Sequence, residues 1–323
     1  MKVLLFGGAG YIGTHVAISF LERGDTVGIY DNLSSGLLEN VQKGSKFYLG
    51  DIMDREKVSE VLSEGWDAVV HLAAAKAAGE SMTNPEKYSR YNITGSLILI
   101  TECIRHSVKN FILSSSAATF GEPGYVPIDE KHPTNPTNYY GYTKLLIEEN
   151  LKWYSKLKGL NFVALRYFNA AGYDTEGRMT GLERSPQNLI PIVMEAATGK
   201  REKIVIFGDD YDTPDGTCIR DYVHVSDLAR AHVMAADFLL KEKRNLIVNL
   251  GSEKGLSVKE IVEASRRITG ADIKSEIGPR RAGDPAKLIA SSKLAEKELG
   301  WKAEESDLDT IIKSTWDVYK RYN

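Results

Sequence analysis

The chain has 323 residues, a hydrophobic content of 42% and a formal net charge of -3. This is enough apolar material for a packed core, and the length suits two domains or one domain with a smaller lobe. The near-neutral charge gives no reason to expect nucleic acid or a membrane surface as a partner. No apolar stretch is long enough to cross a bilayer, and Cys103 and Cys218 form no metal or redox motif. We therefore expect a soluble, cytoplasmic protein with inert cysteines.

The first half of the chain alternates short apolar runs with helical patterns. We expect strands at 2–6, 26–30, 46–52, 67–74, 110–116 and 161–169, and helices at 11–24, 54–65, 91–107 and from about residue 139 onward. This alternation is typical of a parallel sheet covered by helices on both faces, and the nearly all-apolar strands agree with it. The sequence thus predicts an α/β fold with a Rossmann-type doubly wound parallel sheet.

The regular alternation ends after Asn169. Loops then surround one helix at 191–199 and one strand at 203–207, and a further helix follows with Asp227 as its expected N-cap. A strand at 245–251 and amphipathic helices from Ser257 onward complete the chain. We predict a doubly wound domain of residues 1–170 plus 221–252, and a smaller mixed α/β substrate-binding lobe of residues 171–220 plus 253–323.

A glycine triplet follows the first strand. Gly7, Gly10 and Gly13 form G-x-x-G-x-x-G at the start of a helix, and Asp31 ends the next strand 18 residues after Gly13. Glycines at these places allow a tight turn and close approach of the backbone to a pyrophosphate, which the helix N-terminus favours. A carboxylate at the second strand end accepts hydrogen bonds from a ribose 2′-hydroxyl and repels a 2′-phosphate. The pattern predicts NAD as cofactor; the alternative is an ordinary β–α turn.

A second constellation combines a strand end and a helix start. The fifth strand ends in Ser114, Ser115 and Ser116, and Tyr140 precedes Lys144 by four residues. On a helix that spacing puts both side chains on one face. A lysine ammonium beside a phenol favours the phenolate, so we expect Lys144 to lower the pKa of Tyr140 and make it a base. The C-terminal ends of parallel strands line the ligand crevice, so these groups could converge beside a bound nicotinamide.

Several segments together carry a family resemblance, in the order GGAGYIGTH, DNLSSG, HLAAAKAAGES, SSSAATFGEP, YYGYTKLLIE, LRYFNAAG, FGDDYDTPDGTCIRDYVHVSDLA and RRAGDPA. The chain resembles the extended short-chain dehydrogenase/reductase family, and within it the branch that inverts C4 of UDP-sugars. The resemblance implies that bound NAD takes a hydride from C4, and that a 4-keto sugar turns over and takes the hydride back on its other face.

The same resemblance assigns roles to individual residues. Tyr140 would remove and return the 4-hydroxyl proton, Ser116 would hydrogen-bond the same oxygen, and Lys144 would hold the ribose hydroxyls. Besides Gly7, Gly10, Gly13, Tyr140 and Lys144, the NAD shell would include Tyr11, Ile12, Asp31, Asn32, Ser35, Asp51, Ile52, Leu72, Ala73, Ala74, Lys76, Asn92, Ser114 and Phe168. Besides Ser116 and Tyr140, the UDP-sugar shell would include Lys76, Asn169, Asn188, Leu189, Phe207, Arg220, Tyr222, Arg281 and Asp284. No metal is expected.

Alternatives remain at the level of substrate and activity. Related 4,6-dehydratases need a carboxylate after the fifth strand, where this chain reads Ser116-Ala117-Ala118. The residue that limits the sugar pocket in the family falls near Leu288, whose intermediate size leaves UDP-N-acetylhexosamines open, with other UDP-sugars less favoured. A non-catalytic NAD sensor on the same fold is a remote alternative. The resemblance also implies a homodimer that pairs the helices around 86–106 and 139–158. His71 and His224 are expected to be packed and hydrogen-bonded rather than catalytic.

Overall fold

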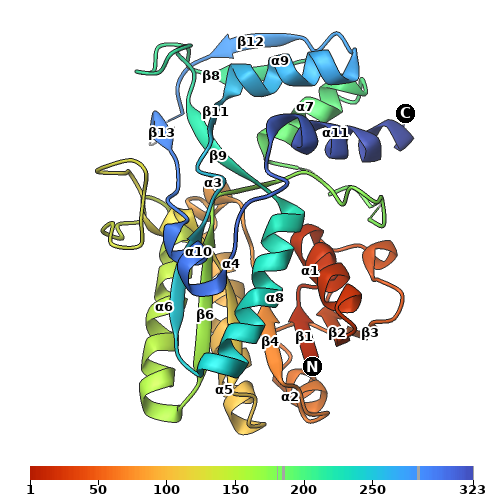
Figure 1. The fold of residues 1–323 in the computed structure, drawn as a ribbon, viewed down its shortest axis with the longest axis vertical. Helices are drawn as coiled ribbons and strands as arrows, with labels where there is room; N and C mark the ends of the chain where they lie inside the picture. Colours follow the sequence, from red (N-terminus) through yellow and green to blue (C-terminus); the bar gives the residue numbers. More distant parts are fainter. Residues whose placement is uncertain (180, 184–185, 282–283, 323) are drawn as a thin grey trace.

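The computed structural model describes residues 1–179, 181–183, 186–281 and 284–322. Within these residues a seven-stranded parallel sheet forms the larger part of the molecule (Figure 1). Its strands, in spatial order, are β10 (Leu246–Leu250), β6 (Asn161–Tyr167), β5 (Asn110–Ser116), β4 (Ala68–His71), β1 (Lys2–Phe6), β2 (Thr26–Asp31) and β3 (Lys46–Leu49). The chain order reverses between β1 and β4, which is where ligands bind in such sheets.

Helices cover both faces of this sheet, as the apolar strands predict. On one face lie α1 (Tyr11–Glu22) and α8 (Val225–Glu242), whose Phe20 and Leu239 share a core with Val3 and Leu5 of β1. On the other face lie α2 (Arg55–Leu62), α5 (Gly95–Arg105) and α6 (Tyr139–Lys158). Alternate residues of one strand therefore enter two separate cores. The predicted fold class is confirmed.

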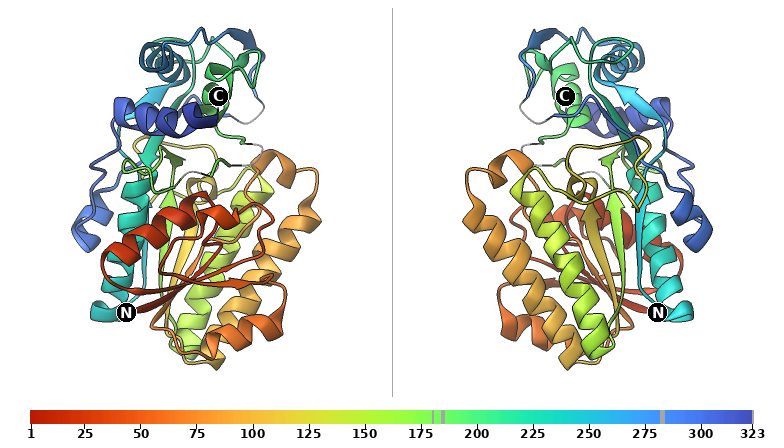
Figure 2. Two further views of the ribbon diagram at one scale, coloured as in Figure 1. Left: turned by 90° about the vertical axis from the view of Figure 1, so that its right-hand side faces the viewer. Right: turned by 90° about the vertical axis from the view of Figure 1, so that its left-hand side faces the viewer.

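A smaller part sits at the C-terminal edge of the sheet, above the strand ends in Figures 1 and 2. Its strands β7 (Asn169–Ala171), β9 (Ile219–His224), β11 (Gly255–Ser257) and β13 (Lys287–Leu288) form one sheet, and β8 (Ile204–Phe207) pairs with β12 (Ser275–Gly278). The helices α7 (Leu189–Ala197), α9 (Val258–Thr269) and α11 (Leu308–Tyr319) share its core. Short helical segments complete the described chain: η1 (Leu38–Asn40), α3 (Ala78–Ser81), α4 (Pro85–Tyr88), η2 (Ser89–Thr94), η3 (Ala117–Thr119), α10 (Lys293–Leu299) and η4 (Lys320–Tyr322).

Two local expectations differ from the structure, and a third is untested. The strand expected at 161–169 is divided: β6 ends at Tyr167, and Asn169 begins β7, which pairs with β9. The helix expected at 91–107 starts as the π-helical segment η2 and becomes α-helical only at Gly95. The predicted division into domains stays a prediction, although Ala295 and Trp301, from the segment assigned to the smaller lobe, pack in a core of the large sheet.

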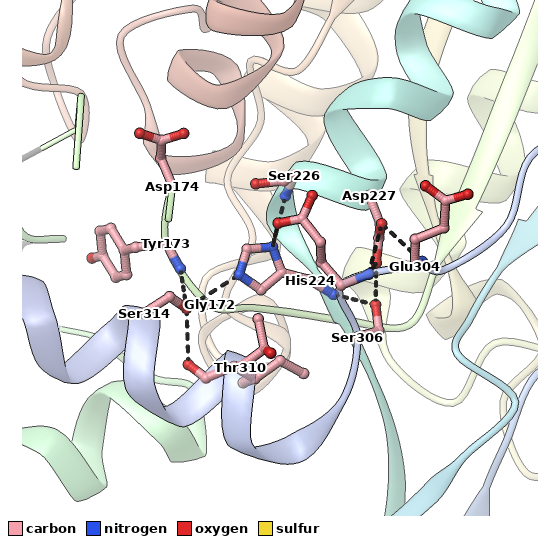
Figure 3. Close-up of polar contacts among 12 residues, drawn as sticks. Gly172, Tyr173, Asp174, His224, Ser226, Asp227, Glu304, Ser306, Thr310 and Ser314 are labelled. Atoms are coloured by element: carbon pink, nitrogen blue, oxygen red, sulfur yellow. Dashed lines mark hydrogen bonds and ion pairs between the residues drawn. The ribbon is translucent and has the colours of Figure 1, made fainter. Parts of the chain in front are cut away.

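The expected N-cap of α8 was wrong. His224 caps this helix, and its Nδ1 accepts a hydrogen bond from the backbone N–H of Ser226 at 3.2 Å. Asp227 lies in the first turn, where its carboxylate accepts hydrogen bonds from the backbone N–H groups of Glu304 and Glu305 at 3.1 and 3.0 Å and from the Ser306 hydroxyl at 2.5 Å (Figure 3). Asp227 therefore ties the returning C-terminal chain to α8.

His224, at the start of α8, joins this helix to α11 of the smaller part. Because its Nδ1 accepts a hydrogen bond, its Nε2 carries the proton and donates to the Ser314 hydroxyl of α11 at 3.1 Å. The same hydroxyl oxygen accepts the backbone N–H of Tyr173 at 3.2 Å, as Figure 3 shows. Burial lowers the pKa of His224 to about 4, so the ring is neutral at pH 7. The expectation of a packed, hydrogen-bonded histidine is confirmed, and it holds equally for His71.

Gly172 leaves room for the His224 ring. It has φ of +80°, and a Cβ at this position would lie 2.2 Å from the ring of His224. We expect Gly172→Ala to lower the free energy of unfolding through backbone strain and through overpacking against the ring. The overpacking should cost about 1–3 kcal/mol in addition to the backbone strain. Urea unfolding measures the change. The matched control is Gly65→Ala, which has φ of +75° but open space around the added methyl; equal losses in the two variants would contradict the predicted clash.

Candidate functional site

The glycine triplet forms a tight cradle at the end of β1. Gly7 has φ of +85°, and a Cβ there would lie 2.7 Å from the backbone nitrogen of Ala73 in the loop after β4. A Cβ on Gly13 would lie 2.2 Å from the Gly7 carbonyl oxygen. Gly10 is the N-cap of α1 and offers no side chain to cap its N–H groups. The helix N-terminus, with Tyr11 and Ile12 in its first turn, is thus shaped to bind an anion such as a pyrophosphate.

Asp31 ends β2 beside this cradle. Its carboxylate accepts hydrogen bonds from the backbone N–H of Ala9 at 3.0 Å and of Leu33 at 2.8 Å, so it holds the glycine turn against the loop after β2. Burial raises its pKa, and the two hydrogen bonds oppose that rise. In the same region Asn32 donates a hydrogen bond to the Asp51 carboxylate at 2.8 Å. A dinucleotide with a free 2′-hydroxyl fits this donor and acceptor set.

The remaining residues expected around the cofactor follow other strands at the same edge of the sheet. They are Ser35 in the loop after β2, Asp51 and Ile52 after β3, Leu72, Ala73, Ala74 and Lys76 after β4, Ser114 in β5 and Phe168 after β6. Parallel strands bring their C-terminal ends to one edge, so these predicted residues lie along that edge of the sheet. Lys76 is the exception: its ammonium forms an ion pair with Glu183 of the smaller part.

Asn92 connects the cofactor side to the helix that carries Tyr140. Its side chain accepts the backbone N–H of Ala75 at 2.8 Å and donates to the Ala75 carbonyl at 3.0 Å and to the Thr143 hydroxyl at 3.1 Å. It is fully buried and projects from η2, a π-helical segment of the kind often found at functional sites. Asn92 thus fixes the loop after β4 against α6.

Tyr140, Lys144 and Ser116 converge as the sequence predicts. The side chains of Tyr140 and Ser116 share a hydrogen bond, and Lys144 Nζ donates to the carbonyl oxygen of Ser114 at 2.8 Å. Lys144 Nζ also lies 5.8 Å from the centroid of the Tyr140 ring. Asn138 caps α6 by accepting the backbone N–H of Gly141 at 2.8 Å, which fixes where the helix starts.

We expected Lys144 to lower the pKa of Tyr140, and for the protein alone this expectation was wrong. Burial raises the pKa of Tyr140, and the hydrogen bond from Ser116 only partly opposes this. Lys144 is itself desolvated, which lowers its pKa to about 8, and its ammonium is directed to the Ser114 carbonyl rather than to the phenol oxygen. A phenolate at neutral pH therefore needs a further positive charge next to Tyr140.

Gly141 allows the close approach of α6 to the end of β5, which sequence reasoning missed. A Cβ on this residue would lie 2.3 Å from the carbonyl oxygen of Ala118 in η3. Any other residue would push the first turn of α6, and with it Tyr140, away from Ser116. The available signal was a glycine directly after the tyrosine, in a helix start where glycine is otherwise unfavourable.

The residues expected around the UDP-sugar lie in the smaller part. Arg220 of β9 donates to the Asp284 carboxylate at 2.6 Å, and the guanidinium of Arg281 lies 4.0 Å from the centroid of the Phe207 ring. Asn188 and Leu189 stand at the start of α7, and Tyr222 is buried in the core of this part. The expected set also includes Asn169, whose side chain donates to the Asp221 carbonyl at 2.9 Å. Ala282 and Gly283 of the RRAGDPA motif lie outside the described residues.

Leu288 connects the smaller part to the reactive residues. It pairs with Arg220 in the register of β13 and β9, and it packs with Phe168 against a small apolar cluster that contains Ala117. Ala117 directly follows Ser116. That Leu288 forms the wall of a sugar pocket stays a prediction.

Within the described part of the chain no group of three or more His, Cys, Asp or Glu residues could hold a metal ion. Among the same residues no helix is long and apolar enough to span a membrane.

Comparison with known proteins agrees with this geometry. Residues 3–251 match the NAD dependent epimerase/dehydratase family. The chain belongs to this family. It is 46% identical to the UDP-glucose 4-epimerase of Halalkalibacterium halodurans over 327 aligned positions, covering 100% of this chain and 96% of that protein.

Solved structures of the family have the same fold. The UDP-glucose 4-epimerase of Brucella ovis, solved in complex with NAD, is 44% identical, with a TM-score of 0.96 and 98% of both chains covered. The UDP-Glc/GlcNAc 4-epimerase of Campylobacter jejuni is 41% identical, with a TM-score of 0.87, 99% of this chain and 99% of that chain covered. The match therefore includes the smaller part as well as the large sheet.

We expect Gly141→Ala to move the first turn of α6 away from Ala118, because the added methyl has no room there. Overpacking of about 1–3 kcal/mol should exceed the gain in helix propensity of about 1 kcal/mol, so the melting temperature should fall. A crystal structure of the variant should show Tyr140 displaced from Ser116. Gly79→Ala, also in a helix but with open space at the added methyl, is the control. A Gly141→Ala structure with an unmoved α6 would contradict this account.

Proposed function

We propose that this protein interconverts UDP-glucose and UDP-galactose by reversible epimerisation at C4, with NAD as its bound cofactor. The observation that carries the proposal is the convergence of Ser116, Tyr140 and Lys144 at the edge of the sheet that also holds the glycine cradle and Asp31. A tyrosine hydrogen-bonded to a serine, next to a dinucleotide site, suits proton exchange at a hydroxyl that is being oxidised.

NAD, when bound, supplies the acceptor and donor of the C4 hydride, and its positive nicotinamide favours the phenolate. Tyr140 then takes the proton from the 4-hydroxyl of the sugar as the 4-keto group forms, and returns it once the sugar has turned over. Ser116 hydrogen-bonds the same sugar oxygen and keeps the phenol directed at it. Lys144 would hold ribose hydroxyls of the cofactor, and its ammonium would contribute a positive charge near Tyr140.

Two arginines account for binding of the diphosphate. Arg220 and Arg281 carry guanidinium groups that can each pair with two phosphate oxygens; Arg220 lies in β9 and Arg281 follows β12. Arg220 is held by Asp284 and Arg281 by the Phe207 ring, so neither side chain has to be ordered from solvent when the substrate binds. Pre-ordered groups bind with a smaller loss of conformational entropy.

A 4-epimerase of UDP-N-acetylhexosamines is the second candidate. It is supported by Leu288, which is neither bulky enough to close the pocket nor small enough to open it fully, and by the similarity to the Campylobacter jejuni protein. The non-catalytic alternative is disfavoured, because a sensor would have no need for the aligned Ser116, Tyr140 and Lys144.

A homodimer through the helices around 86–106 and 139–158 belongs to the same proposal. Its support is the exposure of Trp153 and Leu157 on α6, which leave 58% and 66% of their surface in solvent. Such large apolar side chains favour burial against a partner. The cytoplasmic location stays a prediction.

The test is conversion of UDP-galactose, and separately of UDP-N-acetylgalactosamine, by the purified protein without added cofactor, followed by NMR. We expect UDP-glucose to form, and we expect Tyr140→Phe to lose about 10²–10⁴-fold in rate because its proton exchange is lost. Tyr139→Phe is the matched control on the neighbouring residue. If neither sugar is converted, even with NAD supplied, the proposed activity is contradicted.

A further inference from the structure

A buried carboxylate lies one helical turn beyond Lys144 on the same face of α6. Glu148 has no solvent exposure, and its oxygens accept hydrogen bonds from three donors. Ser115 Oγ donates to Oε1 at 2.5 Å, Arg166 Nε donates to Oε1 at 2.9 Å, and the other end of the Arg166 fork donates to Oε2 at 2.5 Å. None of these residues belongs to the sites described above.

The two partners of Glu148 are neighbours in the sheet. Ser115 of β5 is in register with Arg166 of β6, so one carboxylate on α6 binds two adjacent strands at the same level. Ser115 stands between Ser114, whose carbonyl holds Lys144, and Ser116, which holds Tyr140. Glu148 therefore binds α6 to β5 next to the residues that hold the reactive groups.

We infer that Glu148 is a positioning residue for the proposed reaction: it anchors α6 to the paired Ser115 and Arg166, one helical turn from Lys144. This inference rests on the proposed function. Glu148 itself would contact neither substrate nor cofactor, and it acts through Lys144 and through the strand that carries Ser116.

The electrostatic part of this role follows from the groups around Lys144. Burial lowers the pKa of Lys144 to about 8, and the charge of Glu148 opposes that change. The other groups that face Lys144 are Tyr140 on α6, the Ser114 carbonyl on β5 and the buried, neutral His71 on β4. Glu148 is thus the negative group that favours the ammonium, with Arg166 behind it. Lys144 loses its positive charge as the pH rises through its pKa. Without Glu148 this pKa is lower, so the loss of charge begins at lower pH.

The experiment compares Glu148→Gln with the wild-type holoenzyme. We expect kcat/KM to fall by about 10²-fold at pH 7, since a small displacement of reacting groups costs that much, and the alkaline limb of the pH profile to move to lower pH. Ser115→Ala should lower kcat by about tenfold, as expected for one lost hydrogen bond, without moving the alkaline limb.

Two further variants keep the test decisive. Glu148→Gln leaves Arg166 buried without its carboxylate, and if this variant does not fold, the double variant Glu148→Met with Arg166→Met replaces the pair by apolar side chains that pack at similar volume. Its alkaline limb should also move to lower pH, by less than in Glu148→Gln because the positive charge of Arg166 is removed together with the carboxylate. Glu102→Gln is the matched control, because Glu102 is equally buried and paired with Arg55 but lies near the C-terminal end of α5; its pH profile should equal that of the wild type.

A folded variant without Glu148 that keeps the wild-type pH profile, or that loses activity equally at every pH, would overturn the inference. A second measurement separates this outcome from failure of the proposed function. The fraction of NAD retained after gel filtration at pH 7 and pH 9 should fall more steeply for Glu148→Gln than for the wild type. If the wild type converts neither sugar, the proposed function fails, and equal NAD retention at both pH values would still overturn the role of Glu148.

Discussion

The close contact between the first turn of α6 and the end of β5 is the constraint on which the candidate site depends. Gly141 allows it, since any Cβ there would meet the Ala118 carbonyl. The contact places Tyr140 on Ser116 and Lys144 on the Ser114 carbonyl. If α6 lay further from the end of β5 by the width of a side chain, Tyr140 would lose its hydrogen bond and Lys144 would lose its acceptor. The helix also has to be held against the sheet by buried polar groups, which is the role we assign to Glu148.

Buried carboxylates hold the smaller part over this edge in a similar way. Asp221 accepts the backbone N–H groups of Ser252 at 2.7 Å, Glu253 at 3.1 Å and Ala290 at 3.1 Å, and so it ties β9 to the end of β10 and to the chain after β13. Asp227 does the same for residues 304–306. The motif DGTCIRDYVHVSDLA, which carries much of the family resemblance, thus supplies mainly the joints of the molecule. Arg220, which Asp284 holds in place, and Tyr222 are the residues in it that we expect to serve the substrate.

The regular half of the fold and the centre of the site could be predicted from the sequence because each depends on local spacing. Apolar runs separated by helical patterns predict a parallel sheet covered by helices. A tyrosine four residues before a lysine predicts that both side chains lie on the same face of a helix. The π-helical segment before α5 could not be predicted from local spacing, and Asn92 within it binds Ala75 and Thr143, which lie in other parts of the chain. The N-cap of α8 was misassigned because Asp227 has the right residue type, while its partners lie more than 70 residues away.

The pKa of Tyr140 shows a further limit of sequence reasoning. Spacing identifies Lys144 as a neighbour, but it does not show that the ammonium is bound to a backbone carbonyl or that the phenol is buried. These two facts reverse the expected direction of the shift. A positive charge from a bound cationic cofactor would oppose this rise in the pKa of Tyr140.

We propose that one bound cofactor takes a hydride from C4 and returns it to the same sugar. UDP-galactose with deuterium at C4, converted by the purified protein in ordinary water and analysed by NMR, tests this step. We expect the UDP-glucose formed to keep its deuterium at C4. Loss of the label to solvent would contradict it, because the C4 hydrogen would then leave as an exchangeable proton rather than as a hydride held in the site.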